Sequence, residues 1–153
     1  MTVKLSINQL IEDIYADSAL GVVLGRRDSS GDVALLTADH RRALRRVLAH
    51  AAAVVASQLG NRLLKASVTD SQTDADLGEI TFVLADSCDA SPEALHFHFA
   101  SAVSFAALKL VAVAEGDRNR AATYSACTSE TLAAITSCLD RLPTRIPPRP
   151  LHY

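Results

Sequence analysis

Apolar residues recur along the first twenty positions at the spacing of one helical face. Ile7, Leu10, Ile11 and Ile14 lie on that face, and acidic residues fall on the opposite side. Ser6 followed by Gln9 has the form of a capping box, and Leu5 with Leu10 has the spacing of a hydrophobic staple. The pattern therefore predicts an amphipathic helix from Ser6 to Leu20, which ends near Gly21 or Gly25.

Three further stretches keep a helical period. The second is predicted to start at Thr37, a good N-cap, and to stop at Gly60. The third opens with Ser91-Pro92-Glu93 and is apolar nearly all round from Phe99 to Ala114, which favours a place at the centre of a helical bundle. The fourth is predicted from Thr128 to Leu142, before Pro143 ends it.

Between the second and third predicted helices the period changes to two. Leu64, Ala66 and Val68 alternate with polar residues, as do Ile80, Phe82 and Leu84, across a loop rich in Asp, Ser and Thr. The predicted fold is mainly α: a bundle of about four helices with a β-hairpin inserted between the second and third, all in one domain over residues 1–143.

Residues 144–153 do not continue this pattern. Proline at three of these ten positions favours an extended, polyproline-like arm that is suited to lie on another protein. We expect this arm to contact other structural proteins. Its candidate contact residues are Ile146, Pro147, Pro148, Arg149, Pro150 and Tyr153.

Composition agrees with a helical protein. The chain of 153 residues is 49% apolar but has only four Phe, three Tyr and no Trp, which suits close helix packing. The odd number of cysteines, Cys88, Cys127 and Cys138, predicts reduced thiols. Early acidic residues exclude an ordinary signal peptide, so we expect a cytoplasmic protein. Lys109 interrupts the apolar third helix and argues against a membrane span.

Charge is segregated along the chain, although its net value is only −2. Eight basic residues lie between Arg26 and Lys65, and seven acidic residues lie between Lys65 and Lys109 with no basic residue among them. Complementary patches steer association, so the segregation predicts a homo-oligomer. The candidate contact residues are Arg41, Arg42, Arg45 and Arg46 on one side and Asp70, Asp74, Asp76 and Glu79 on the other. Nucleic acid and the acidic residues of the first predicted helix are alternative partners for the arginines, but no aromatic residues are interleaved with them as nucleic-acid binding favours. The plainer alternative is that the arginines form a solvated face.

No pattern predicts catalysis, a metal or a cofactor. His96 and His98 are two residues apart, and on a helix they point to different sides. The aspartates after residue 70 lack the residue order of an EF-hand loop, and no G-x-S-x-G, G-x-G-x-x-G or P-loop occurs. An enzyme that uses Cys88 or a histidine is therefore our third hypothesis.

The order of elements over residues 5–115 resembles that of the small helical connector and completion proteins that form rings between the head and tail of tailed bacteriophages. The resemblance rests on a capped helix, a long helix, an acidic hairpin and a central helix. It implies a ring-shaped homo-oligomer in the virion that contacts neighbouring structural proteins and has no enzymatic site. The alternative is a helical small-molecule-binding or regulatory domain, with a pocket lined by Phe97, Phe99, Phe105 and Tyr124.

Overall fold

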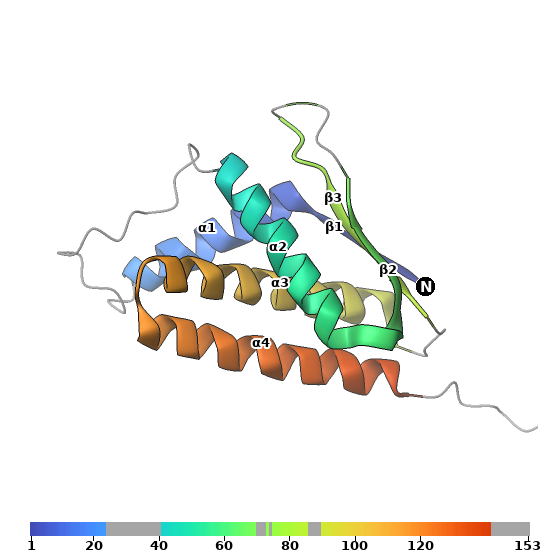
Figure 1. Ribbon diagram of the computed structural model, residues 1–153. Coiled ribbons are helices and arrows are strands. Elements are labelled where there is room, and N and C mark those ends of the chain that lie inside the picture. The colour runs from blue at the N-terminus through green and yellow to red at the C-terminus, as the bar shows by residue number, and fades with distance from the viewer. Residues whose placement is uncertain (24–40, 70–72, 74, 86–89, 142–153) are drawn as a thin grey trace, which may run out of the picture.

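The computed structural model of the protein describes residues 1–23, 41–69, 73, 75–85 and 90–141, and of residues 17–23 the backbone alone. In these residues the chain forms β1 (Thr2–Ser6), α1 (Ile7–Val23), α2 (Arg41–Leu59), the short 3-10 helix η2 (Gly60–Arg62), β2 (Leu63–Val68), β3 (Glu79–Leu84), α3 (Pro92–Ala114) and α4 (Arg118–Leu139). Four helices dominate, and the predicted hairpin lies between the second and third, so the mainly α prediction is confirmed (Figure 1).

Within the described residues the sheet has three strands, whereas the sequence predicted two. Its order is β1-β3-β2, and both pairs are antiparallel. Strand β1 was missed because it spans only five residues directly before a strong helix signal. Its alternation is nevertheless clear in hindsight, since Val3 and Leu5 are buried between exposed neighbours. The sequence therefore predicted the β2–β3 hairpin but missed β1, the strand that forms one edge of the sheet.

Strand β2 forms the other edge, and its predicted apolar face is largely exposed. A bulge between Leu63 and Lys65 makes Leu63 the partner of Leu84, so Leu64 is left out of the pairing and is 71% exposed. In the central strand β3, by contrast, Ile80, Phe82 and Leu84 are all buried. A bulged edge is also a recognised means of limiting edge-to-edge aggregation.

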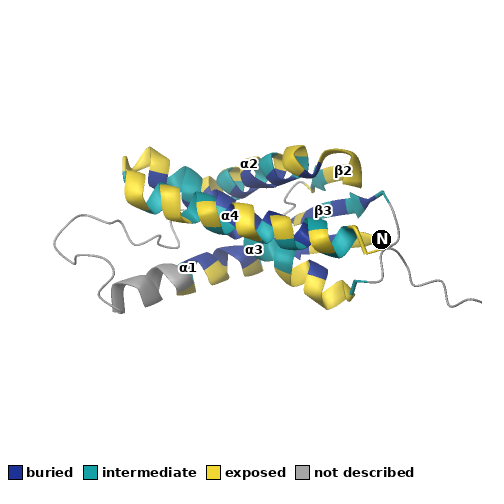
Figure 2. Ribbon diagram, turned by 90° about the horizontal axis from the view of Figure 1, so that it is seen from below, coloured by how far each residue is buried: buried dark blue, intermediate teal, exposed yellow. Residues whose placement is uncertain are grey.

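Helix α3 is the centre of the fold, as predicted. It contacts α1, α2, α4 and β1, and Figure 2 shows it between α1 and α4. Phe99 on α3 is fully buried, and its ring centroid lies 4.8 Å from that of Phe82 on β3. This pair joins the helices and the sheet in one core. By length and composition alone α3 could cross a membrane, a property that it shares with the core helices of soluble proteins.

Helix α4 begins ten residues before its predicted start at Thr128. Gly116, with φ of +75°, turns the chain after α3, and the Asp117 side chain caps α4 by accepting a hydrogen bond of 3.0 Å from the Arg120 N–H. The Gly-Asp pair was the overlooked signal. The predicted seam is confirmed in Leu132 and Ile135, which are buried; the predicted end at Leu142 lies outside the described residues.

The helix caps agree with the sequence in part. The Gln9 N–H donates to Ser6 Oγ at 3.5 Å, but the Gln9 side chain donates to Asp13 at 3.1 Å instead of completing the capping box. Ser91 occupies the N-cap of α3, as predicted, without a side-chain hydrogen bond. The predicted cap at Thr37 and the arm over residues 144–153 lie outside the described residues.

Candidate functional site

Two of the four predicted arginines turn inward at the start of α2. Arg45 Nε donates to the Leu77 carbonyl oxygen at 2.9 Å, and its Nη2 donates to the Thr69 carbonyl oxygen at 3.0 Å. Arg41 Nη2 donates to Asn8 Oδ1 at 3.2 Å. Residues four apart share one side of a helix, which is why Arg41 and Arg45 act together. Arg45 thus binds the base of the hairpin and Arg41 binds Asn8, both within their own subunit. That these arginines also contact a second copy stays a prediction.

Asn8 connects the first turn of α1 to the same place. Its Nδ2 donates to the Ala75 carbonyl oxygen at 2.9 Å, and its Oδ1 accepts from the Leu77 N–H at 3.4 Å as well as from Arg41. We refer to Asn8, Arg41, Arg45, Thr69 and Leu77 as the hairpin junction. Sequence reasoning missed Asn8 and Thr69, because nothing in the pattern indicates that residues about seventy positions apart lie side by side.

Backbone conformation keeps the hairpin junction tight. Gly78 has φ of +92°, and a Cβ atom there would lie 2.6 Å from the Thr69 carbonyl oxygen. Only glycine fits without a shift of the backbone. The Asp76 carboxylate accepts from the Gly78 N–H at 3.0 Å. The hairpin base is thus held by hydrogen bonds to both α1 and α2.

The acidic residues that were predicted to bind a partner are described only in part. Asp76 supports the turn before β3 and is exposed, and Glu79 begins β3, with its carboxylate 4.0 Å from the Lys4 ammonium. Both remain accessible on the hairpin. Asp70 and Asp74 lie outside the described residues, as do the arm residues Ile146, Pro147, Pro148, Arg149, Pro150 and Tyr153.

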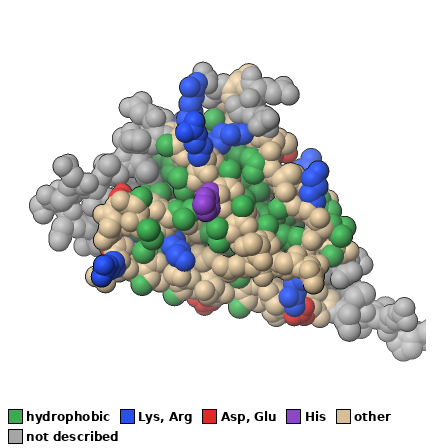
Figure 3. Space-filling model, viewed as in Figure 1, with side chains coloured by type: hydrophobic (Ala, Val, Ile, Leu, Met, Phe, Trp, Pro, Cys, Tyr) green, Lys and Arg blue, Asp and Glu red, His purple; other side chains and the backbone are tan. Residues whose placement is uncertain are grey.

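The other side of α2 faces outward. Arg42 and Arg46 are exposed, and His50 is exposed one turn after Arg46. Lys109 of α3 is half-buried and lines a pocket together with Val54, which lies one turn after His50 on α2. Figure 3 shows Lys and Arg side chains spread over this face, with Asp and Glu side chains only near its margins. We define Arg46, His50 and Lys109 as the basic face. In the described part of the chain, no salt bridge joins Arg46 or Lys109 to an acidic residue.

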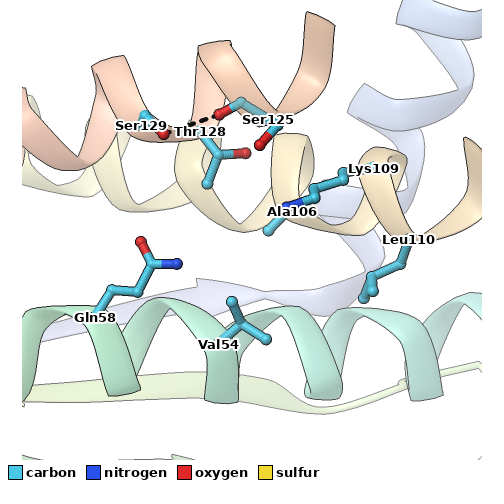
Figure 4. Close-up of a pocket in the computed structure, with 8 residues that line it drawn as sticks. All are labelled: Val54, Gln58, Ala106, Lys109, Leu110, Ser125, Thr128 and Ser129. Carbon is cyan, nitrogen blue, oxygen red and sulfur yellow. Dashed lines mark hydrogen bonds between the residues drawn. The ribbon is translucent and has the colours of Figure 1, made fainter. Parts of the chain in front are cut away.

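A pocket of about 120 Å³ opens on the basic face between α2, α3 and α4. Figure 4 shows that three helices contribute to it and that the Lys109 side chain extends into the space between α2 and α4. We call it the three-helix pocket. Its lining residues are Val54, Gln58, Ala106, Lys109, Leu110, Ser125, Thr128 and Ser129.

The aromatic residues that the sequence suggested for a pocket do not line the three-helix pocket. Phe99 packs in the core, Phe97 is 67% exposed, and the Phe105 and Tyr124 rings stack with centroids 6.5 Å apart. None of these four lines the three-helix pocket. The signal that could have located the pocket is Lys109, the single charged residue between Phe99 and Ala114.

The histidines and cysteines form no cluster in the described residues. His96 is exposed and His98 half-buried on α3, and the structure brings no group of three His, Cys, Asp or Glu side chains together within its described ranges. His96 lines a second pocket, of about 250 Å³, with Gln9 and Asp13 of α1. Cys127 and Cys138 are free thiols, whereas Cys88 lies outside the described residues.

Comparisons of the chain with known protein families, curated proteins and solved structures gave no match.

Proposed function

We propose that the protein is a non-enzymatic assembly subunit that forms a homo-oligomer. The observation that carries this proposal is the basic face, where Arg46 and Lys109 have no carboxylate partner among the described residues. Charges of one sign that their own subunit leaves unpaired are suited to steer a complementary surface into register.

The complementary surface is the acidic hairpin. Asp76 and Glu79 are exposed there, and the hairpin junction holds its base to α1 and α2. In Figure 1 strands β2 and β3 lie to one side of the helices, whereas Lys109 of the basic face belongs to the central helix α3. A subunit therefore carries its two charged surfaces in different places, and the hairpin of one copy can reach the basic face of the next.

Such a contact joins two different surfaces and is heterologous. Heterologous contacts produce a ring where the rotation between subunits closes, and a filament where it does not. A ring is what the resemblance to phage head–tail connector proteins implies, so we extend the proposal to a ring-forming subunit of that kind. The arm after residue 143 remains a predicted contact for other structural proteins, and a cytoplasmic or virion location remains part of the proposal.

Light scattering after size exclusion tests the proposal. The Arg46→Gln, Lys109→Gln double variant should have a lower mass than the unchanged protein at low salt, because two steering charges are removed. The matched control is Arg118→Gln with Arg141→Gln, which removes two exposed charges at opposite ends of α4. A monomeric unchanged protein at low salt, or equal masses for all three proteins, would contradict the proposal.

A further inference from the structure

Lys109 is an unusual residue for its position. It is the single charged residue in an apolar run of sixteen, Phe99 to Ala114, on the central helix. Its side chain is half-buried and lines the three-helix pocket, and no described acidic residue forms a salt bridge with it. A lysine commonly extends its stem over apolar surface and leaves the ammonium in water. Here the half-buried side chain lies along α3 in the space between α2 and α4, where it lines the pocket (Figure 4).

The polar groups around Lys109 favour an anion. The Gln58 amide and the Ser125 hydroxyl can both donate hydrogen bonds, and both residues line the pocket. Thr128 and Ser129 already donate their hydroxyl protons to the carbonyl oxygens of Tyr124 and Ser125, at 2.7 and 3.0 Å. The pocket therefore offers one positive charge and a few neutral donors, and no carboxylate lines it.

The remaining wall is apolar. Val54 of α2 and Leu110 and Ala106 of α3 line it. A single charge beside an aliphatic wall suits a monoanion with a hydrocarbon stem better than a phosphate dianion, which needs more donors to replace its water. The volume of about 120 Å³ is somewhat below the roughly 150 Å³ cavity that holds benzene.

We propose that the three-helix pocket binds the carboxylate of a short aliphatic acid, of about the size of butanoate. The carboxylate would lie against the Lys109 ammonium and accept hydrogen bonds from Gln58 and Ser125, and the stem would contact Val54 and Leu110. The pocket belongs to one subunit, so this proposal does not depend on the assembly function, although both proposals use the Lys109 ammonium.

Amide NMR spectra recorded during a titration with sodium butanoate test the site. Resonances of Gln58, Lys109 and Ser125 should shift saturably, whereas sodium chloride at equal ionic strength and the neutral butanamide should leave them unchanged. In the Lys109→Met variant, which keeps an unbranched stem of similar length, the dissociation constant should rise at least about tenfold, because hydrogen bonds to charged groups contribute strongly to binding.

A second variant protects the test against misfolding. Gln58 is exposed, so Gln58→Ala should fold normally and weaken butanoate binding by a smaller factor. The proposal is overturned if butanoate shifts no resonance near the pocket, if butanamide acts equally, or if the Lys109→Met protein binds as tightly as the unchanged one. Because binding is read from resonances and assembly from mass, a failure of either proposal is seen separately.

Discussion

The two sides of α2 show how one run of sequence serves two purposes. Its inner side carries the buried Leu44, Leu48 and Val55 and, at its start, Arg41 and Arg45, which bind the hairpin junction. Its outer side carries the exposed Arg46 and His50. The four arginines look alike in the sequence, but the inner pair stabilises the fold and the outer side is accessible to a partner.

The difference teaches that a cluster of like charges is not a single site. An inward arginine stabilises the fold where its donors reach oxygen atoms of other segments, because a hydrogen bond from a charged donor contributes more than one between neutral groups. An outward arginine in solvent has little effect on stability. Substitutions on the two sides should therefore change different measured quantities.

The largest effect is expected in the inner apolar row. Leu48 is fully buried, so Leu48→Ala should lower the free energy of unfolding by about 2 to 5 kcal/mol through lost burial and a residual cavity. Urea titration measures this change. His50→Ala, on the exposed side two residues along, is the control and should stay within about 0.5 kcal/mol of the unchanged protein. Similar losses for both variants would show that the two sides do not differ.

The hairpin junction should give an intermediate effect. Asn8→Ala removes three hydrogen bonds, to Ala75, Leu77 and Arg41. It should lower the free energy of unfolding by about 1 to 3 kcal/mol, because the bonds to Leu77 and Arg41 are partly buried and their partner groups are left unpaired. Hydrogen exchange should show weaker protection at Leu77 and Gly78 in this variant. Unchanged exchange there would mean that α1 does not hold the hairpin.

Replacing one arginine from each side sharpens the comparison. Arg45→Met breaks two hydrogen bonds to Leu77 and Thr69 and should lower the unfolding free energy by about 1 to 2 kcal/mol. Arg46→Met removes the same charge from an exposed position, so it should change stability by less than about 0.5 kcal/mol and reduce oligomer mass instead. If Arg46→Met proves the more destabilising, the division of α2 into two sides is wrong.

The smallest effect should come from salt. Raising ionic strength from about 0.05 to 0.5 M shortens the screening length to a few ångströms and should lower the oligomer mass of the unchanged protein. The difference in unfolding midpoint between Leu48→Ala and the unchanged protein should hardly change with salt, because the burial of apolar area is not a charge effect. An oligomer whose mass rises with salt would point to an apolar contact, such as the exposed Leu64 on β2.

Local signals predicted much of the fold. The helix period located α1, α2 and α3, the predicted caps at Ser6 and Ser91 agree with the starts of α1 and α3, and the period of two located the hairpin. Strand β1 and the first ten residues of α4 were missed, although Val3, Leu5, Gly116 and Asp117 carried their signals. Exposure on β2 could not be read from alternation, since the bulge at Leu64 depends on how the strand pairs with β3.

The candidate site was predictable only as a set of residues. The sequence singled out Arg41, Arg42, Arg45 and Arg46, but did not separate the inner from the outer pair, and it did not connect Lys109 with Gln58 and Ser125. Those three come from different helices, so no local pattern joins them. Residue spacing indicates which side chains share a helix face, but it does not indicate which faces pack against one another.

By itself the sequence determined a mainly α protein with a central apolar helix, a hairpin after the second helix and segregated charge, because periodicity, capping and composition act over a few residues. Only the tertiary structure decided that Asn8 and two arginines secure the hairpin, that β1 completes the sheet, and that a lone lysine lies in a pocket between three helices. These outcomes depend on contacts between segments far apart in the chain, whose geometry is set by the packing of the whole core.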